Sequence, residues 1–343
     1  MDAEDAAGPS SRSLPIVQLD MRIPDVNVKY EKDRPVPPHC PKLFFIGAIV
    51  GSRGSGKTHA MIQLMQMYNA SKTFDKTYVI CPTYDSDPKY KLFETLDTQL
   101  TVHREFNDAI WAEVEEEIQG DLDEYDAYVE RLAIWKKAMN PKQIETLSED
   151  EYAELERTGF EKPSTRWKHG KPTSVLILDD LVGSSLYRAD CKGRFNSWAI
   201  RHRHARTAVI FLAQVWANAV PRQLRANLSL ALLFRCKNTG ITKEIASEFS
   251  SYVSIEDFQA MWDQATAEDH GFLLCDFESP KGEQMRIGFD KAFPINFERS
   301  KKDKAKEPKE PKKPRPSRAK APSKAKDPRD AVVPVPADSV IAK

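Results

Sequence analysis

The stretch that decides the fold reads GSRGSGKT at residues 51–58, directly after the apolar run LFFIGAIV at residues 43–50. It matches G-x-x-x-x-G-K-[ST] at every fixed position. Glycines allow a tight turn in which backbone N–H groups converge on phosphate oxygens. The lysine of such a turn reaches the β- and γ-phosphates, and the last hydroxyl binds Mg²⁺. The motif therefore predicts a nucleoside triphosphate site. Its residues are Gly51, Ser52, Arg53, Gly54, Ser55, Gly56, Lys57 and Thr58.

Short apolar runs alternate with helical patterns along most of the chain. Runs with few polar side chains, too short for helices, are typical of strands buried on both faces of a parallel sheet. The predicted strands are 43–50, 77–80, 174–178, 207–212 and 228–234, and the predicted helices are 57–69, 189–204, 221–227 and two within 242–265. Residues 271–277 and 284–289 predict a late hairpin. This alternation predicts an α/β fold with a mostly parallel sheet and helices on both faces.

A second candidate site segment is VLILDD at residues 175–180. A buried strand that ends in a carboxylate can place Asp179 beside the triphosphate, where it binds Mg²⁺ directly or through water. Asp180 is then placed to orient or deprotonate an attacking water. A strand that ends in two aspartates is common by itself, so this interpretation depends on the upstream phosphate motif.

The third candidate is Gln214, just beyond the predicted strand 207–212. In a parallel sheet the carboxyl ends of the strands converge on the ligand crevice. Gln214 is therefore predicted to contact the γ-phosphate or to position the water. The alternative is a polar residue that only solvates the end of the strand.

Charge is distributed unevenly although the formal net charge is zero. Residues 299–343 carry 15 Lys and Arg against 6 Asp and Glu, a balance of +9, and residues 1–298 carry the opposite balance. We expect a flexible arm at 1–40, an ATPase domain at 41–298 with an acidic helical insertion at about 86–165, and a disordered basic tail at 299–343. The tail is predicted to bind DNA, to act as a nuclear-import signal or only to solubilise the chain.

The composition also indicates in which cellular compartment we expect the protein. No apolar run reaches the roughly 18–20 residues that span a bilayer, so we expect no membrane span. The N-terminus lacks the apolar region of a secretory signal. The five cysteines are far apart and form no C-x-x-C pair, which favours a reducing compartment.

The phosphate motif, the segment LILDD at 176–180, and the block from Arg201 through Gln214 resemble, in this order, the FtsK–HerA superfamily of DNA-pumping ATPases. The segment PRQLRAN at 221–227 is similar to the family's Pro…Arg-x-Asn segment. The poxvirus-type genome-packaging ATPases of large DNA viruses and related mobile elements are the most similar branch. Superfamily members often carry Glu where Asp180 stands, and the acidic insertion is a further departure.

This resemblance implies a RecA-like (ASCE) P-loop sheet with ATP and Mg²⁺ as cofactors. It also implies a homo-oligomeric ring that moves double-stranded DNA into a capsid. Capsid or portal-type viral proteins would then be partners, and the host cytoplasm or nucleus, or the virion itself, the place of action.

Ring ATPases complete each site with an arginine from the next subunit, which stabilises charge in the transition state. Arg225 is the first candidate, with Arg201 or Arg222 as alternatives. The arginines at 201, 203 and 206 are also candidates for contacts with DNA phosphates. His202 and His204 alternate as metal ligands do, but no third ligand is visible in the sequence, which disfavours a metal site.

Two further functions remain open from the sequence. A non-motor P-loop enzyme, such as a small-molecule kinase, would use the 86–165 insertion as a lid. A scaffold protein with a relict nucleotide site is disfavoured because Lys57, Thr58 and Asp179 are all intact.

Overall fold

The computed structural model describes residues 34–181, 183–187, 194–216, 220–222, 224–236, 239–280 and 282–293. The chain divides into two compact units, Met1–Phe297 and Glu298–Lys343. All described residues belong to the first unit. The predicted basic tail, residues 1–33 of the predicted arm and residues 189–193 of the predicted helix 189–204 lie outside the described residues.

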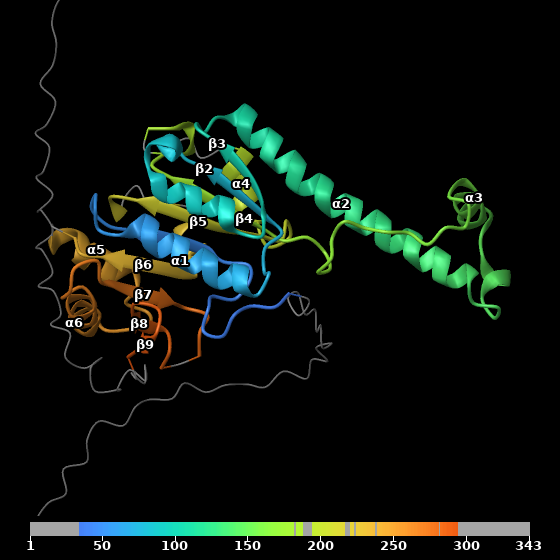
Figure 1. The fold of residues 1–343 in the computed structure, drawn as a ribbon. Coiled ribbons are helices and arrows are strands. Elements are labelled where there is room, and N and C mark those ends of the chain that lie inside the picture. Colours follow the sequence, from blue (N-terminus) through green and yellow to red (C-terminus); the bar gives the residue numbers. More distant parts are fainter. Residues whose placement is uncertain are drawn as a thin grey trace, which may run out of the picture. The chain divides into compact units, whose positions relative to one another are not determined.

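Within the described residues, nine strands form one mixed sheet in the order β3-β2-β4-β5-β1-β6-β7-β8-β9 (Figure 1). The strands are β1 (Ile46–Val50), β2 (Lys76–Ile80), β3 (Gln99–His103), β4 (Ser174–Asp179), β5 (Thr207–Ala213), β6 (Leu230–Phe234), β7 (Phe272–Asp276), β8 (Met285–Ile287) and β9 (Lys291–Ala292). Strands β1 to β6 run parallel, and β7 to β9 add antiparallel pairs at one edge. This is the mostly parallel P-loop sheet that the sequence predicts, with the hairpin β7–β8 where it was expected.

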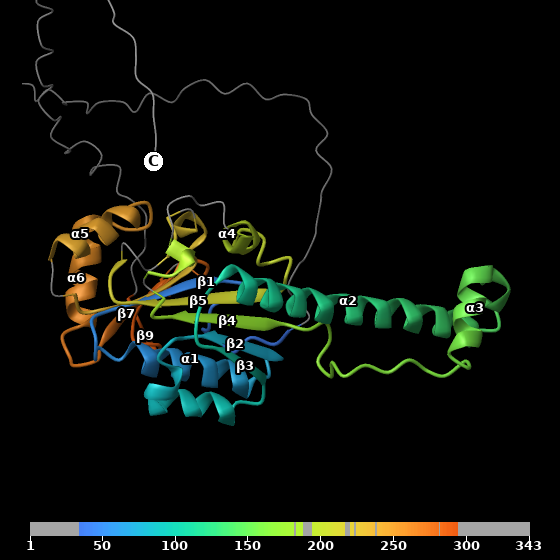
Figure 2. The ribbon, with the colours of Figure 1, turned by 90° about the horizontal axis from the view of Figure 1, so that it is seen from above.

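Helices cover both faces of the sheet, as Figure 2 shows for α1 and α4. The α-helices are α1 (Lys57–Ala70), α2 (Asp108–Ala138), α3 (Glu149–Arg157), α4 (Arg194–Ala199), α5 (Thr239–Glu248) and α6 (Ile255–Ala265). The 3-10 helices are η1 (Tyr84–Ser86), η2 (Pro88–Thr95), η3 (Ile144–Thr146), η4 (Ser185–Tyr187) and η6 (Arg225–Asn227). One buried cluster joins α1 and η2 to a face of the sheet, and a second joins α2, α4 and α6 to the other face. Burial of apolar area on both faces is the main stabilising term of such a sheet.

Strand β3 was not predicted from the sequence. It pairs only with β2 and lies at the edge of the sheet, where its side chains are partly exposed. An edge strand needs no continuous apolar run, so its sequence QLTVH gives a weak signal. The region predicted as a helical insertion therefore also supplies a strand of the sheet.

Helix α2 is continuous over 31 residues. The apolar positions Trp111, Val114, Ile118 and Leu122 are buried against the sheet. The same period continues to Val129, whose side chain is 43% exposed because no strand lies beneath that part of the helix. In Figure 2 the second half of α2 extends past the strands, and α3 lies at its far end. The predicted helical insertion is therefore present, and the sheet covers only the first half of its long helix.

Gly120 does not interrupt α2, although a glycine inside a helix costs about 1 kcal/mol relative to alanine. A methyl group added there meets no atom within 4 Å. We expect Gly120→Ala to raise the free energy of unfolding by about 1 kcal/mol in urea denaturation, because it narrows the backbone freedom of the unfolded chain. Gly159 has equally open surroundings but a φ of +64°, so Gly159→Ala should lower stability. Equal effects of the two variants would contradict this account.

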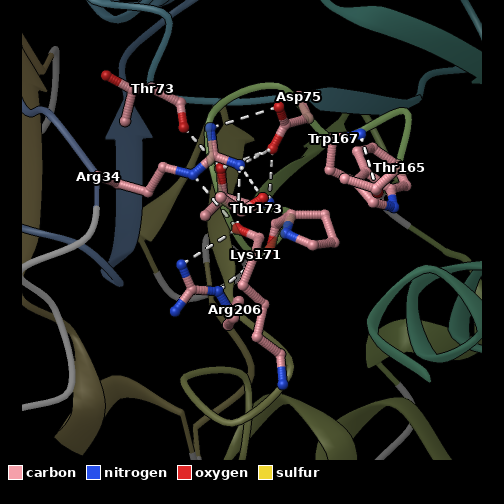
Figure 3. A network of polar contacts seen from close by, with 10 residues as sticks. Arg34, Thr73, Asp75, Thr165, Trp167, Lys171, Thr173 and Arg206 are labelled. Carbon is pink, nitrogen blue, oxygen red and sulfur yellow. Dashed lines mark hydrogen bonds and ion pairs between the residues drawn. The ribbon is translucent and has the colours of Figure 1, made fainter. Parts of the chain in front are cut away.

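The amino ends of β2, β4 and β5 are held together by a polar network around Arg34 (Figure 3). The guanidinium of Arg34 binds both carboxylate oxygens of Asp75 and donates to the carbonyl of Lys171 at 2.9 Å. Asp75 also accepts from the Thr173 backbone N–H at 2.9 Å. Arg206 donates to the Pro172 carbonyl at 3.1 Å. These bonds fix residues 171–173, where the chain re-enters the sheet after α2 and α3. They also tie Arg34, which falls in the predicted arm, to the residues before β2 and β4.

Removal of the Arg34 cation would leave Asp75 poorly solvated, since the two side chains are only 1% and 12% exposed. Breaking a buried pair by removing one partner typically costs 3–5 kcal/mol. We expect Arg34→Met to lower the free energy of unfolding by roughly 3 kcal/mol, measured by chemical denaturation. Arg104→Met removes a similar but exposed pair with Asp85 and should have a much smaller effect. A loss in Arg34→Met no larger than in Arg104→Met would contradict the network's role.

Among the described residues, no helix has both the length and the apolar composition needed to cross a membrane.

Candidate nucleotide site

The Gly-rich turn at 51–58 joins β1 to α1, as its sequence predicts. Gly54 and Gly56 have φ values of +80° and +106°, a conformation that side chains with a Cβ rarely adopt. Gly51 is required for a different reason. A Cβ at Gly51 would lie 2.5 Å from the Cβ of Phe234 and 2.6 Å from the hydroxyl of Ser55. The turn can therefore form only with glycine at these positions.

Polar groups of this turn point toward its interior. The ammonium of Lys57 donates to the carbonyls of Gly51 and Ser52 at 2.9 and 3.1 Å. The Ser55 hydroxyl is buried and has no hydrogen-bond partner among the described residues. Burial lowers the pKa of Lys57, and the charges of Asp179 and Asp180 oppose that shift. A cation held among backbone groups at a helix N-terminus fits a phosphate ligand.

Asp179 is the last residue of β4, and Asp180 follows it with a φ of +53°. Burial raises the pKa of the Asp179 carboxyl, while a hydrogen bond from the Tyr90 hydroxyl and the charge of Lys57 oppose that shift. The Asp180 side chain is exposed to solvent. The two neighbouring carboxylates are thus in different environments: Asp179 is sheltered for binding a cation, and Asp180 is open to water.

Gln214 follows β5, which is hydrogen-bonded between β1 and β4. Val50 of β1 pairs with Ala213, and Asp179 of β4 pairs with Leu212. Because these three strands run parallel, the residues that follow them emerge at the same edge of the sheet. Gln214 therefore lies between the Gly-rich turn and the aspartates.

A cavity of about 590 Å³ brings the predicted pieces together. Its lining includes Arg53, Gly54, Gly56, Lys57, Thr58, Asp179, Asp180 and Gln214. Of the predicted site residues, Gly51, Ser52, Ser55 and Arg225 are not in this lining. Gly51 and Ser52 accept hydrogen bonds from Lys57 through their carbonyls, and the Ser55 hydroxyl is buried within the turn.

The structure adds one wall that the sequence analysis missed. Residues of the segment between β2 and β3 also line the cavity, among them Thr83, Asp87, Lys89 and Tyr90. A signal was present, since the run ending at Ile80 was predicted as a parallel strand and its carboxyl end must meet the same edge as Asp179. His270 is a further unpredicted neighbour, with its Nδ1 atom 3.2 Å from the Ser55 carbonyl oxygen.

Arg225 contacts residues of its own chain. It pairs with Glu248 at 2.9 Å and donates to the carbonyls of Val220 and Trp216. Its guanidinium also lies over the Trp216 ring, 5.7 Å from the centroid. Its predicted contact with the site of a neighbouring subunit stays a prediction, as do those of Arg201 and Arg222, which are exposed.

The described residues contain no group of three or more His, Cys, Asp or Glu side chains placed to hold a metal ion. His202 is buried, and its Nδ1 atom lies 2.8 Å from the Thr207 carbonyl oxygen. Burial lowers its pKa to about 4. A magnesium ion in the cavity would instead be held by Thr58, Asp179 and the phosphates themselves, the oxygen ligands that Mg²⁺ prefers.

No protein-family model matches the sequence, and no curated protein matches it. Among solved structures, the DNA-packaging ATPase B204 from Sulfolobus turreted icosahedral virus is similar to 68% of this chain and 92% of its own, with 18% identity and a TM-score of 0.42. The genome-packaging NTPase B204 from Sulfolobus turreted icosahedral virus 2, in complex with ATP-gammaS, has 14% identity, the same coverages and a TM-score of 0.39. The pCW3 conjugation coupling protein TcpA is similar to 75% of this chain and 62% of its own, with 14% identity and a TM-score of 0.36.

The order of its strands, the Gly-rich turn between β1 and α1, and the aspartates at the end of β4 define the class: the chain has the P-loop NTPase fold.

Proposed function

We propose that this protein is an ATPase that uses hydrolysis to move double-stranded DNA, with the packaging of a viral genome into a capsid as its task. The observation that carries hydrolysis is the position of Gln214 in the cavity, between the Gly-rich turn and the two aspartates. A polar amide there suits the orientation of a water molecule. DNA as the moved substrate, the ring, the capsid partners and action at the site of virion assembly rest on the family resemblance of the sequence.

The proposed chemical roles belong to residues that line the cavity or shape the Gly-rich turn. Lys57 and the N–H groups of the turn would bind the phosphates of ATP, and Thr58 and Asp179 would hold a Mg²⁺ ion that offsets the phosphate charge. Asp180 is exposed to water and accepts the proton of the attacking water molecule. Gln214 orients that molecule toward the γ-phosphate. The products are ADP and inorganic phosphate.

The turn that precedes β5 carries basic side chains that could contact DNA. Arg201 and Arg203 are exposed in the turn before β5, and Arg203 pairs with Glu278 at 2.8 Å. Arg206 is instead engaged with backbone carbonyls and with the Phe44 ring, 5.5 Å from its centroid. Arg201 and Arg203 are therefore better placed for phosphate contacts than Arg206.

Substitutions separate binding from turnover. Asp180→Asn keeps the shape of the side chain and suits a residue with positive φ, since asparagine adopts this conformation readily. We expect it to bind ATP like the wild type but to hydrolyse it on the order of 100-fold or more slowly, because a general base contributes about that much. Lys57→Ala should abolish hydrolysis and weaken ATP binding. Equal hydrolysis rates in Asp180→Asn and wild type would remove the role assigned to Asp180.

The proposed function is tested by the effect of duplex DNA on hydrolysis. We expect linear double-stranded DNA to raise the rate of phosphate release by the oligomeric full-length protein at low salt. The effect should weaken as salt rises from roughly 50 to 200 mM, because phosphate contacts release counterions. Asp180→Asn serves as the background control. An assembled oligomer whose hydrolysis does not respond to DNA at low salt would count against a DNA motor, and phosphate transfer to a small acceptor would favour a kinase.

A further inference from the structure

Part of the cavity wall comes from a segment to which the proposed mechanism assigns no role. This wall segment comprises residues 83–90, between β2 and β3. Its cavity-lining members are Thr83, Ser86, Asp87, Pro88, Lys89 and Tyr90.

The wall segment is anchored by Tyr90. The Tyr90 side chain is almost completely buried, and its ring packs against those of Tyr84 and Phe93, with centroids 5.0 and 6.0 Å away. Its hydroxyl donates a hydrogen bond to Asp179. The segment is therefore tied to the carboxylate that the proposed mechanism assigns to Mg²⁺.

Lys89 stands directly before this anchor. The carboxylate of Asp87 caps the turn by accepting from the Lys89 backbone N–H at 3.0 Å. The Lys89 side chain is exposed and lines the cavity. Within the described part of the chain, its ammonium forms no ion pair. It is thus a cation beside the cavity that is available to a ligand.

The strand order indicates which part of a nucleotide would meet Lys89. Strand β2 pairs with β4, and β4 is separated from β1 by β5. The wall segment follows β2, and its Tyr90 hydroxyl donates to Asp179, so the segment borders the cavity beside this carboxylate. Thr58 and Asp179 would hold a Mg²⁺ ion against the terminal phosphates of ATP, so a cavity cation beside Asp179 would be close to the γ-phosphate.

We propose that Lys89 contacts the γ-phosphate of ATP. Tyr90 positions Lys89 by anchoring the wall segment to Asp179 through its hydrogen bond. This inference rests on the proposed ATP site but not on DNA as a partner. A cation at the terminal phosphate is in contact with the group that distinguishes ATP from ADP. It also stabilises the charge that develops on this group as the bond to ADP breaks.

The test compares Lys89→Met with Lys91→Met in the full-length protein. Lys91 is an exposed lysine in the same short helix, η2, and is not in the cavity lining. Affinities for Mg²⁺-ATPγS and Mg²⁺-ADP are measured by calorimetry without DNA. We expect Lys89→Met to bind ATPγS about tenfold more weakly, as for the loss of one charge-assisted hydrogen bond, with unchanged affinity for ADP. Lys91→Met should match the wild type for both, and Lys89→Arg should restore most of the lost affinity.

Hydrolysis provides the second measurement. Removal of one donor to a developing anion lowers kcat by roughly 100-fold, so Lys89→Met should lose kcat on that scale. Tyr90→Phe keeps the ring packing but loses the hydroxyl. It should lower kcat while ADP affinity stays unchanged, because it leaves the phosphate-binding turn intact.

Equal losses for ATPγS and ADP in Lys89→Met would overturn the assignment, as would unchanged affinity or an equal effect in Lys91→Met. These outcomes are independent of the DNA experiment. A protein that discriminates ATPγS through Lys89 but ignores duplex DNA would refute the motor and retain the role of Lys89.

Discussion

The hydrogen bonding of β5 between β1 and β4 is the constraint on which the site depends. Val50 pairs with Ala213, and Asp179 pairs with Leu212, so the three strands end at the same level. The residues that follow these strands must therefore lie together at the carboxyl ends of the sheet. They are the Gly-rich turn after β1, Gln214 after β5 and Asp180 after β4. Parallel pairing with this register converts three separate stretches of sequence into a single cavity. A shift of one residue in either pair would turn every side chain to the opposite face.

The amino ends of the parallel strands, which lie away from the cavity, hold charged side chains of a different kind. Around the first residues of β2, β4 and β5, buried charges are paired rather than open to a ligand. Arg34 binds Asp75, and Lys76 binds Glu117 and Asp121 of α2, both at 2.6 Å. Buried ion pairs of this kind contribute little net stability but are costly to break. They fix where α2 leaves the sheet, at the end of the strands away from the cavity.

Within the cavity, unlike charges lie close together in a partly dry environment. Burial lowers the pKa of Lys57 and raises that of Asp179, and each residue offsets part of the other's shift. Tyr90 adds a hydrogen bond to Asp179 from a segment beyond the sheet's central strands. The carboxylate is thereby oriented before any ion binds, which lowers the cost of forming a metal site.

The sequence by itself determined the Gly-rich turn, the central parallel strands and the late hairpin, because glycine requirements and apolar runs are local signals. It also singled out Asp179, Asp180 and Gln214 as residues that follow buried strands. Only the tertiary structure decided that β3 joins the sheet and that α2 buries Leu122 but leaves Val129 exposed. It alone brought Lys89 and Tyr90 to the cavity. These features depend on which elements lie beside one another, and no local pattern of residues encodes such long-range pairing.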